Sequence, residues 1–385
     1  MTSAASSNPS LPKRCCPATP PTSCSSALPA DARLPRKGPL MEVIIASTIV
    51  PFIEGGGTLI VDSLEHALRQ CGHSVCTLKI PFHSDYRVMP RQMLGLRMLN
   101  VSASGQRLIT IRTPSYLIRH PHKVIWFIHH HRTAYDLWDS PYREIPDDPT
   151  GHAYRDLLFS ADMLAFREAR AIYTNSKVVG QRLLRFNGVG SEVLYPPLMN
   201  PEAYRGGKHG DYILYVSRIV HHKRQDLAVE SMLHTKTPVR LVIAGKSETQ
   251  SMRDRLHSLI ERHRLLDKVV LLDEWISEER KRDLIAGCAG CLYIPQDEDS
   301  YGYPTLEAFH AGKPMITASD SGGTLEIIDH GVNGFIARPE PASIAAAMDE
   351  LYKDPSRAAE MGEHGRQSID RLGIRWDRVV EKLLQ

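Results

Sequence analysis

This sequence has few cysteines, no long apolar run and little net charge. It therefore gives no support for a disulfide framework, a membrane-spanning segment or a broad charged face. Only seven cysteines occur in 385 residues, at irregular spacing, which argues against a disulfide scaffold and favours reduced thiols in a cytoplasmic setting. No stretch approaches the roughly 18 consecutive apolar residues of a spanning helix. Cys288 and Cys291 form one Cys-x-x-Cys pair, but no second pair completes a zinc site, so we expect two buried free thiols.

Net charge is small and unevenly distributed. The formal charge is +3, but residues 1–40 hold five basic side chains against one acidic one, which leaves −1 on the rest. A nearly neutral body gives no electrostatic footprint for nucleic acid, so we expect no such partner. Residues 1–40 are dense in Pro, Ser, Thr and Ala and lack aromatic residues, which predicts a disordered tail. Met41 opens the first apolar strand, and we take it as the natural start.

The first half alternates strands with helices, as an open α/β domain does. The expected first strand, Val43–Ala46, leads into Gly55-Gly56-Gly57 and then into a helix with Thr58 as N-cap and Gly72 at its end. Long or helical connections between the further apolar strands indicate a parallel sheet. Those strands are expected at Ser74–Leu78, Leu108–Ile111, Val124–Ile128 and Ala171–Thr174. We therefore expect an α/β domain over residues 41–200.

A Pro- and Gly-rich break from Tyr195 to Gly210 separates this half from a second, cleaner alternation of strands and helices. Six βα units of this kind imply a doubly wound parallel sheet over residues 201–370. Two Rossmann-like domains would then face each other across a cleft, with a ligand at the carboxyl ends of their strands. The second set of strands is expected at Ile213–Val216, Val239–Ala244, Val269–Leu272, Cys291–Ile294, Met315–Thr317 and Phe335–Ala337.

A dinucleotide-binding enzyme is the first alternative for this cleft, and the details disfavour it. A Gly-x-Gly-x-x-Gly match that begins at Gly55 would need glycine where Ile60 stands, and no acidic residue ends the second strand near Lys79. The three glycines still allow a ligand to approach the backbone at a helix N-terminus.

A diphosphate site is the second alternative, carried by the C-terminal half. Arg218 and Lys223 lie in the loop after the first strand of that domain, where two fixed cations suit a diphosphate. We expect Lys223 to be an exposed charge in the cleft. Taken alone, an Arg and a Lys in a loop are more often solvated surface charges.

The segment from Asp297 to Glu307 makes a ligand site more specific. Pro304 at the first helical position and Gly312 after the last predict a helix whose N-terminus favours an anion. Gly302 lets the preceding loop pass close to a bound group. Glu307 can accept hydrogen bonds from two ribose hydroxyls, and Asp299 lies on the loop that leads into the helix. Alternatively, Glu307 is only an acidic residue favoured in the first helical turn, and the acidic run is a solvated loop.

These residues resemble the retaining GT-B glycosyltransferases of the group one type over roughly residues 41–385. An acidic residue, seven residues and then Glu mark that family, and Asp299 and Glu307 match them. The resemblance implies that Arg218 and Lys223 bind the donor diphosphate, that Glu307 binds the ribose and that Asp299 contacts the transferred sugar. It also implies that Gly302 and Tyr303 present backbone near the phosphates. The family usually has Glu where this chain has Asp299, which leaves its sugar selectivity open.

The resemblance extends to the N-terminal half. His129, in the run Trp126 to Arg132, matches a family histidine that contacts the transferred sugar, so the implied catalytic residues are Asp299, Glu307 and His129. Gly55, Gly56 and Gly57 resemble the family's phosphate and acceptor loop. Adjacent histidines on a strand point to opposite faces, so we expect no metal there. Ser176 is either part of the site or a helix cap, and the expected helix over residues 371–385 resembles one that returns to the first domain.

Together these features predict an enzyme that transfers a sugar from a nucleotide-diphosphate sugar to a hydroxyl acceptor, without a metal or other cofactor. A noncatalytic sugar-nucleotide-binding protein and a nucleotide-sugar epimerase are the alternatives. The acceptor, whether a glycan, a lipid-linked sugar or a small molecule, is left open, as is the oligomeric state. Arg87, Arg91 and Arg97 fit either a solvated face or peripheral contact with anionic lipid.

Overall fold

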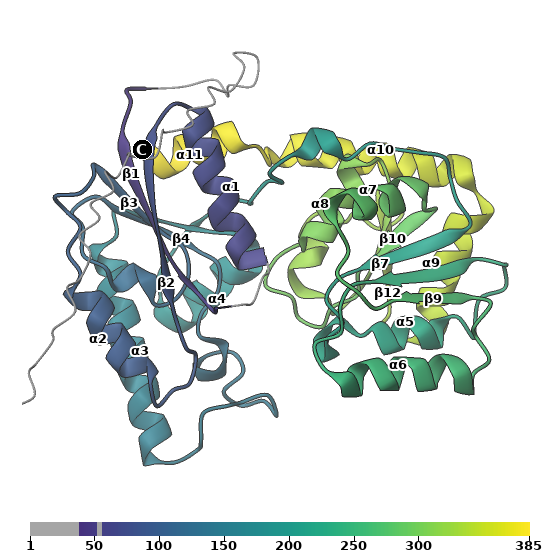
Figure 1. The fold of residues 1–385 in the computed structure, drawn as a ribbon, viewed down its shortest axis with the longest axis horizontal. Coiled ribbons are helices and arrows are strands. Elements are labelled where there is room, and N and C mark those ends of the chain that lie inside the picture. Colours follow the sequence, from purple (N-terminus) through teal and green to yellow (C-terminus); the bar gives the residue numbers. More distant parts are fainter. Residues whose placement is uncertain (1–37, 52–55) are drawn as a thin grey trace, which may run out of the picture. The chain divides into compact units, whose positions relative to one another are not determined.

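The computed structural model describes residues 38–51 and 56–385. Most of the tail predicted over residues 1–40 lies outside these ranges, and so does Gly55 of the glycine loop. The described residues belong to one compact unit. This unit contains two parallel six-stranded sheets, and we call the part around the first sheet the first lobe and the part around the other the second lobe (Figure 1).

The first lobe is built on a sheet with the strand order β2-β1-β3-β4-β5-β6. Its strands are β1 (Glu42–Ile49), β2 (Ser74–Pro81), β3 (Arg107–Thr110), β4 (Lys123–Phe127), β5 (Ala171–Thr174) and β6 (Glu192–Val193). Its helices are α1 (Gly56–Gln70), α2 (Met89–Met98), α3 (Pro149–Glu168) and α4 (Lys177–Asn187). Apolar side chains project from both faces of the sheet. Val43 and Ile45 belong to one buried cluster, and Ile44 and Ala46 belong to another. This double burial explains why the strands are continuous apolar runs in the sequence.

The second lobe has the strand order β12-β11-β10-β7-β8-β9, all parallel. Its strands are β7 (Tyr212–Val216), β8 (Arg240–Ala244), β9 (Val269–Leu272), β10 (Gly290–Leu292), β11 (Met315–Ala318) and β12 (Gly334–Ala337). Its helices are α5 (Gln225–Ser231), α6 (Gln250–Arg262), α7 (Glu278–Gly287), α8 (Tyr303–His310), α9 (Pro341–Lys353) and α10 (Pro355–Leu372). The strand order reverses between β7 and β10, as it does between β1 and β3 in the first lobe. Open α/β sheets bind ligands beside such a reversal, at the carboxyl ends of the strands.

The predicted doubly wound α/β class is therefore confirmed, and the differences are local. Helix α1 begins at Gly56, so Thr58 lies inside the helix rather than at its cap, and Pro304 is the second residue of α8. Gly72 and Gly312 both end helices in the left-handed region, with φ of 88° and 64°. Asn333, which the sequence predicts only as part of a turn, is buried and donates to Ile327 O and Ser368 Oγ at 3.0 Å.

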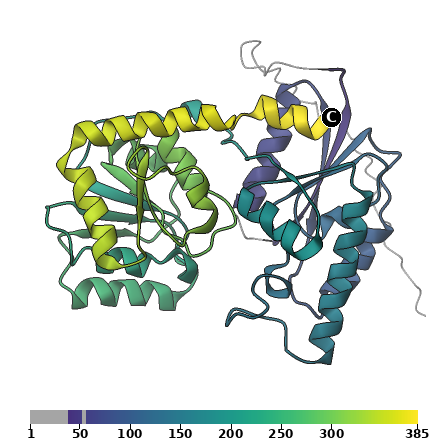
Figure 2. The ribbon, with the colours of Figure 1, turned by 180° about the vertical axis from the view of Figure 1, so that it is seen from behind.

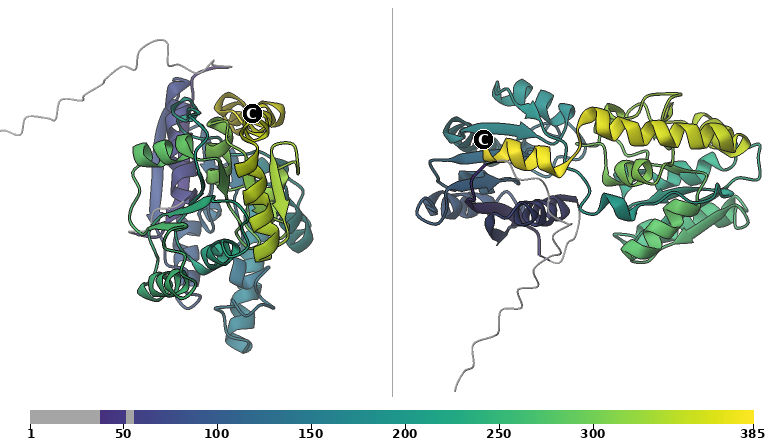
Figure 3. Two further views of the ribbon diagram at one scale, coloured as in Figure 1. Left: turned by 90° about the vertical axis from the view of Figure 1, so that its right-hand side faces the viewer. Right: turned by 90° about the horizontal axis from the view of Figure 1, so that it is seen from above.

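The last helix, α11 (Trp376–Leu384), packs against the first lobe, whereas α10 packs on the second (Figures 2 and 3). The Trp376 indole donates to Leu198 O at 2.7 Å, and Arg107 donates to Leu384 O at 2.9 Å. Apolar residues of α11 join the cluster that α1 forms on the first sheet. The C-terminal segment therefore ties the two lobes together.

Two expectations about the chemistry of the chain can be compared directly with the described residues. Cys288 and Cys291 are free and buried, with their Sγ atoms 3.7 Å apart, as predicted. Within residues 38–51 and 56–385, no helix combines the length and the apolar character needed to cross a bilayer.

Candidate functional site

Lys223 lies at the strand reversal of the second lobe, in the segment that follows β7. Its ammonium group donates to the Tyr293 hydroxyl at 2.5 Å and pairs with the Glu298 carboxylate. Tyr293 and Glu298 both follow β10, the strand beside β7, and Tyr293 donates to Glu298 at 3.1 Å. Lys223 is 9% exposed, so the prediction of an exposed charge is wrong. The cation is instead held in place by one carboxylate and one phenol.

Glu298 stays ionised because of this lysine. Burial by itself would raise the pKa of the Glu298 carboxyl, but the charge of Lys223 and its hydrogen bond outweigh burial, and the pKa falls below its usual value. A second anion that entered beside Lys223 would therefore compete with Glu298 for the same ammonium group.

Arg218 is not brought into this cluster. Its side chain is 50% exposed and lies 3.5 Å from the Glu248 carboxylate, a weak surface pair. Arg218 and Lys223 lie in the same segment after β7, but they share no partner. The long, solvated arginine side chain is free to move toward a ligand at little cost.

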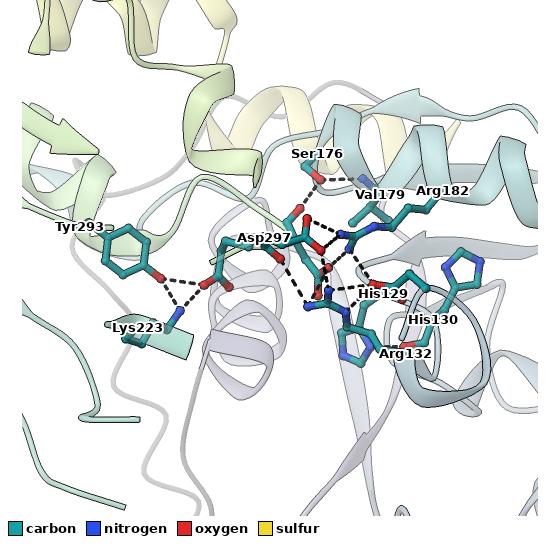
Figure 4. Close-up of polar contacts among 12 residues, drawn as sticks. His129, His130, Arg132, Ser176, Val179, Arg182, Lys223, Tyr293 and Asp297 are labelled. Atoms are coloured by element: carbon teal, nitrogen blue, oxygen red, sulfur yellow. Dashed lines mark hydrogen bonds and ion pairs between the residues drawn. The ribbon is translucent and has the colours of Figure 1, made fainter. Parts of the chain in front are cut away.

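Asp299 points away from its neighbour Glu298 and meets the first lobe. Its Oδ1 atom pairs with Arg182 of α4 and lies 3.6 Å from Nη1 of Arg132. Figure 4 shows Arg132 and Arg182 approaching Asp297 together. Arg182 Nη2 donates to both Asp297 oxygens at 2.8 Å, and Arg132 Nη2 donates to Oδ2 at 3.0 Å.

Burial dominates the ionisation of Asp299. It raises the pKa of this carboxyl to about 6, although Arg132 and Arg182 act in the opposite direction. We call Arg132, Arg182, Asp136, Asp297 and Asp299 the inter-lobe ion cluster. Asp136 belongs to the first lobe and accepts a hydrogen bond from Arg132 Nε at 2.8 Å.

The start of α4 makes a second set of contacts with the second lobe. Ser176 caps α4 by accepting from Val179 N at 3.1 Å, which agrees with its interpretation as a helix cap, and its hydroxyl also donates to Asp299 O. The first two amides of α4, at Lys177 and Val178, donate to the Glu326 carboxylate at 2.8 and 2.9 Å. A carboxylate at a helix N-terminus is favourable because the first amides have no partner in the helix.

Glu307 is buried on α8 and binds a different cation from the one at Asp299. Its Oε1 atom accepts from Lys281 Nζ at 2.7 Å and from the Tyr204 hydroxyl at 3.1 Å. Burial alone would lower the pKa of Lys281, but Glu307 and Glu278 outweigh burial and raise it. Among the described residues, nothing donates to the Oε2 atom of Glu307. Glu298 and Glu307 are therefore bound by different lysines, Lys223 and Lys281.

Gly302 and Tyr303 lie where α8 begins. Gly302 has φ of 72°, and a Cβ there would lie 2.3 Å from the Tyr293 ring, so the turn into α8 requires glycine. The Tyr303 ring would lie 3.7 Å from a Cβ on Gly56, and its buried hydroxyl has no hydrogen-bond partner within residues 38–51 and 56–385. This tyrosine therefore brings α8 of the second lobe against the glycine loop.

The three consecutive histidines bind three different partners. His129 Nδ1 lies 2.7 Å from His130 O, and burial lowers the pKa of His129 to about 4. His130 pairs with the Asn187 side chain, whereas His131 reaches Ser84 O. In the part of the chain that the structure describes, no three His, Cys, Asp or Glu side chains are grouped as metal ligands. His129 is thus a neutral imidazole.

Arg112 lies beside the glycine loop and is a candidate residue that sequence reasoning did not single out. It follows β3 at the strand reversal of the first lobe, and a Cβ on Gly57 would lie 3.2 Å from its side chain. It donates weakly to Thr48 O at 3.4 Å, and no carboxylate of residues 38–51 or 56–385 pairs with it. Burial accordingly lowers the pKa of Arg112. The sequence signal for Arg112 is its position directly after the apolar strand Leu108–Ile111.

The arginines considered for lipid contact do not form one free face. Arg97 makes two hydrogen bonds to Glu168, at 2.7 and 2.6 Å, and Arg87 is bound to Asp85 at 2.9 Å. Arg91 alone of the three is exposed without a charged partner among the described side chains.

Comparisons with known proteins agree with this geometry. Residues 202–368 match the family described as glycosyl transferases group 1. This match covers the second lobe of the chain. A curated relative is the human alpha-1,3/1,6-mannosyltransferase ALG2, which is 29% identical over 170 residues, 41% of this chain and 40% of that protein. Another is the GDP-mannose-dependent alpha-(1-6)-phosphatidylinositol monomannoside mannosyltransferase of Mycobacterium tuberculosis, 28% identical over 177 residues, 44% of this chain and 46% of that protein.

Solved structures resemble this chain over both lobes. Anabaena HepE in complex with UDP has a TM-score of 0.66 at 16% identity and covers 89% of this chain and 99% of its own. Sucrose-phosphate synthase from Thermosynechococcus elongatus has a TM-score of 0.69 at 17% identity and covers 88% and 97%. These likenesses establish the GT-B fold. The sequence matches to the curated relatives span less than half the length of those proteins.

Proposed function

We propose that this protein transfers a sugar from a nucleotide-diphosphate sugar to a hydroxyl group of an acceptor. The observation that carries the proposal is the lysine held at the strand reversal of a group 1 glycosyltransferase lobe, with Glu298 as an exchangeable partner. The printed names of the relatives include GDP-mannose-dependent and other mannosyltransferases, and HepE was solved with UDP. These names support a nucleotide-sugar donor, with the sugar and base unassigned.

In this mechanism, the bond between the anomeric carbon and the diphosphate oxygen breaks, and a bond to the acceptor oxygen forms while that hydroxyl passes its proton to the departing diphosphate. Lys223 and Arg218 stabilise the charge that grows on the departing diphosphate. Glu307 holds the ribose through Oε2, because Lys281 and Tyr204 already use Oε1. Asp299 and His129 hold the transferred sugar, and the resemblance to the retaining members of the family supports retention of configuration.

A polar cavity of about 270 Å³ in the first lobe supports a hydroxyl-bearing acceptor. It adjoins the carboxyl ends of β2 and β4, close to the histidine run. Its lining includes His83, Ser84, Tyr86, His131, Thr133 and Glu144. These groups offer donors and acceptors for a sugar or another polyol, and we assign the acceptor to this cavity. The two reduced thiols at Cys288 and Cys291 support action in a reducing, cytoplasmic compartment.

Donor and acceptor assays test the function directly. We expect a nucleotide sugar to raise the melting temperature in a panel of UDP- and GDP-sugars, because it binds the native state. Addition of a hydroxyl acceptor to that donor should release nucleoside diphosphate and form a glycoside. Binding without turnover would instead support a noncatalytic protein, and interconversion of free nucleotide sugar without acceptor would support an epimerase.

Replacement of Arg112, which lies beside the glycine loop, should affect thermal stability and phosphate binding in opposite directions. A largely buried cation that no described carboxylate pairs with is costly to the fold, so Arg112→Met should leave the melting temperature unchanged or raise it. We propose that Arg112 and Gly57 bind a phosphate of the substrate, so the same variant should lose most of the stabilisation that inorganic pyrophosphate gives the wild type. Thermal shift with and without pyrophosphate measures both. The exposed Arg91→Met is the control, and full pyrophosphate stabilisation in Arg112→Met would contradict the assignment.

A further inference from the structure

We propose that Arg182 and Arg132 are positioning residues of the transfer reaction: from the first lobe they hold Asp299, and with it the two lobes, in the arrangement that transfer requires. This inference rests on the proposed function for its kinetic part. Its structural part concerns contacts among the described side chains and stands without any substrate.

The geometry of Asp299 supports a positioning role. Both arginines approach the same oxygen, Oδ1, through Arg182 Nη1 and Arg132 Nη1. No described residue donates to Oδ2, so this oxygen remains available to a sugar hydroxyl. Glu307 has the same division, with Lys281 and Tyr204 on Oε1 and Oε2 free. In both acids, one oxygen is fixed by the protein and the other is left for a ligand.

Opposite charges on the two lobes stabilise the contact between them. The Asp299 side chain is 18% exposed, and the buried Oδ1 atom of Asp136 has no hydrogen-bond partner among the described residues. Two guanidinium groups on one lobe face two carboxylates on the other, with Asp136 beside the guanidinium groups. Removal of Arg182 leaves the mostly buried Asp299 carboxylate with Arg132 alone, 3.6 Å away, which is more costly than the loss of a surface pair. The cheapest relief is for the lobes to separate, so that water reaches Asp299.

Asp297 makes a second contact between the lobes, and no role in ligand binding is assigned to this residue. It takes a left-handed backbone conformation, φ of 47°, that non-glycine residues rarely adopt, and its carboxylate is bound by Arg182 and Arg132. The two arginines therefore hold the whole loop between β10 and α8, which carries Glu298 and Asp299 toward the site. Arg182 also compensates for the short side chain of Asp299, because a long guanidinium reaches it from α4.

Hydrogen exchange at the start of α4 measures the lobe contact without substrate. The amides of Lys177 and Val178 have no partner within the helix and are bonded to Glu326 of the second lobe. In Arg182→Gln we expect these two amides to exchange about tenfold faster, while the amides of Val179 and later residues keep their protection. This pattern separates opening of the lobes from unfolding of α4. Arg185→Gln, an exposed arginine on the same helix that lies over Phe186, is the matched control.

Kinetics test the positioning role. Because Lys223 and Glu307 lie wholly in the second lobe, Arg182→Gln should lose at most the part of the affinity for the nucleoside diphosphate that Arg112 adds from the first lobe. Its kcat should fall about 100-fold, since a small displacement of a reacting group has a cost of this order. Arg182→Lys should recover part of the rate. Asp297→Asn should cause a related loss, and the double variant should lose less than the product of the two single losses, because both changes break the same contact.

The outcomes separate the two hypotheses. If the wild type transfers no sugar from any donor, the proposed function fails, and the exchange experiment still decides the lobe contact. Unchanged exchange at Lys177 and Val178 in Arg182→Gln would overturn the structural inference. Faster exchange together with wild-type kcat would overturn the positioning role, and so would equal losses of rate in Arg182→Gln and Arg185→Gln.

Discussion

Replacement of Lys223 by alanine is expected to lower the rate of sugar transfer by about 10²–10³-fold. In the proposed mechanism its ammonium group stabilises negative charge on the leaving diphosphate, and removal of one preorganised donor at a developing anion typically has an effect of this size. The measurement is kcat/KM for nucleoside diphosphate release in the presence of donor and acceptor. Lys236→Ala, an exposed lysine elsewhere in the second lobe, should retain the wild-type rate.

The same substitution also affects the fold, which the sequence alone does not predict. Lys223 is the counter-ion of the largely buried Glu298, so Lys223→Ala should destabilise the protein by about 1–3 kcal/mol. Addition of Glu298→Gln removes the unpaired charge and should recover most of the melting temperature, but none of the activity. This pair of variants separates catalysis from stability. A Lys223→Ala enzyme with wild-type turnover would refute the role of the lysine, whatever its melting temperature.

The sequence predicts the sheets well because their physical cause is local. Val269–Leu272 is predicted and found as β9 with the same bounds, since an apolar run between polar turns can be little else in an alternating α/β chain. Gly72 and Gly312 end helices for an equally local reason, the left-handed backbone conformation that each adopts. Errors occur at helix starts such as Gly56, where tertiary contacts extend a helix past its expected cap.

Side-chain partners could not be predicted in this way. Glu298 and Asp299 are adjacent, yet one binds Lys223 and the other binds Arg182, and no periodicity in an irregular loop determines which. Arg182 is 117 residues from Asp299 in the chain, and its spacing on α4 marks it only as a partly exposed helix residue. The exposed position expected for Lys223 failed for the same reason, because burial of a charge depends on a partner that the sequence does not identify.

Replacement of Glu307, which binds Lys281, is expected to cause a large loss of nucleotide affinity. In Glu307→Gln the Oε1 atom can still accept from Lys281 and Tyr204, but an amide group that donates replaces the free Oε2 atom that would accept the ribose hydroxyls. Loss of hydrogen bonds to a charged acceptor corresponds to about 1.5–3 kcal/mol. The affinity for the nucleoside diphosphate should therefore fall about 10- to 100-fold, as measured by calorimetry.

A double variant shows whether this loss comes from the ribose or from an unpaired lysine. The side chain of Lys281 is 14% exposed, and in Glu307→Gln its remaining carboxylate is the exposed Glu278, so part of any effect could come from rearrangement around the buried ammonium group. Glu307→Gln combined with Lys281→Met removes that charge and should recover stability while the nucleotide affinity stays low. Lys281→Met alone keeps the carboxylate but frees Oε1, and it should weaken binding less than Glu307→Gln does. If the double variant instead binds nucleotide like the wild type, Glu307 acts as a counter-ion of Lys281, and the ribose must be held by another group.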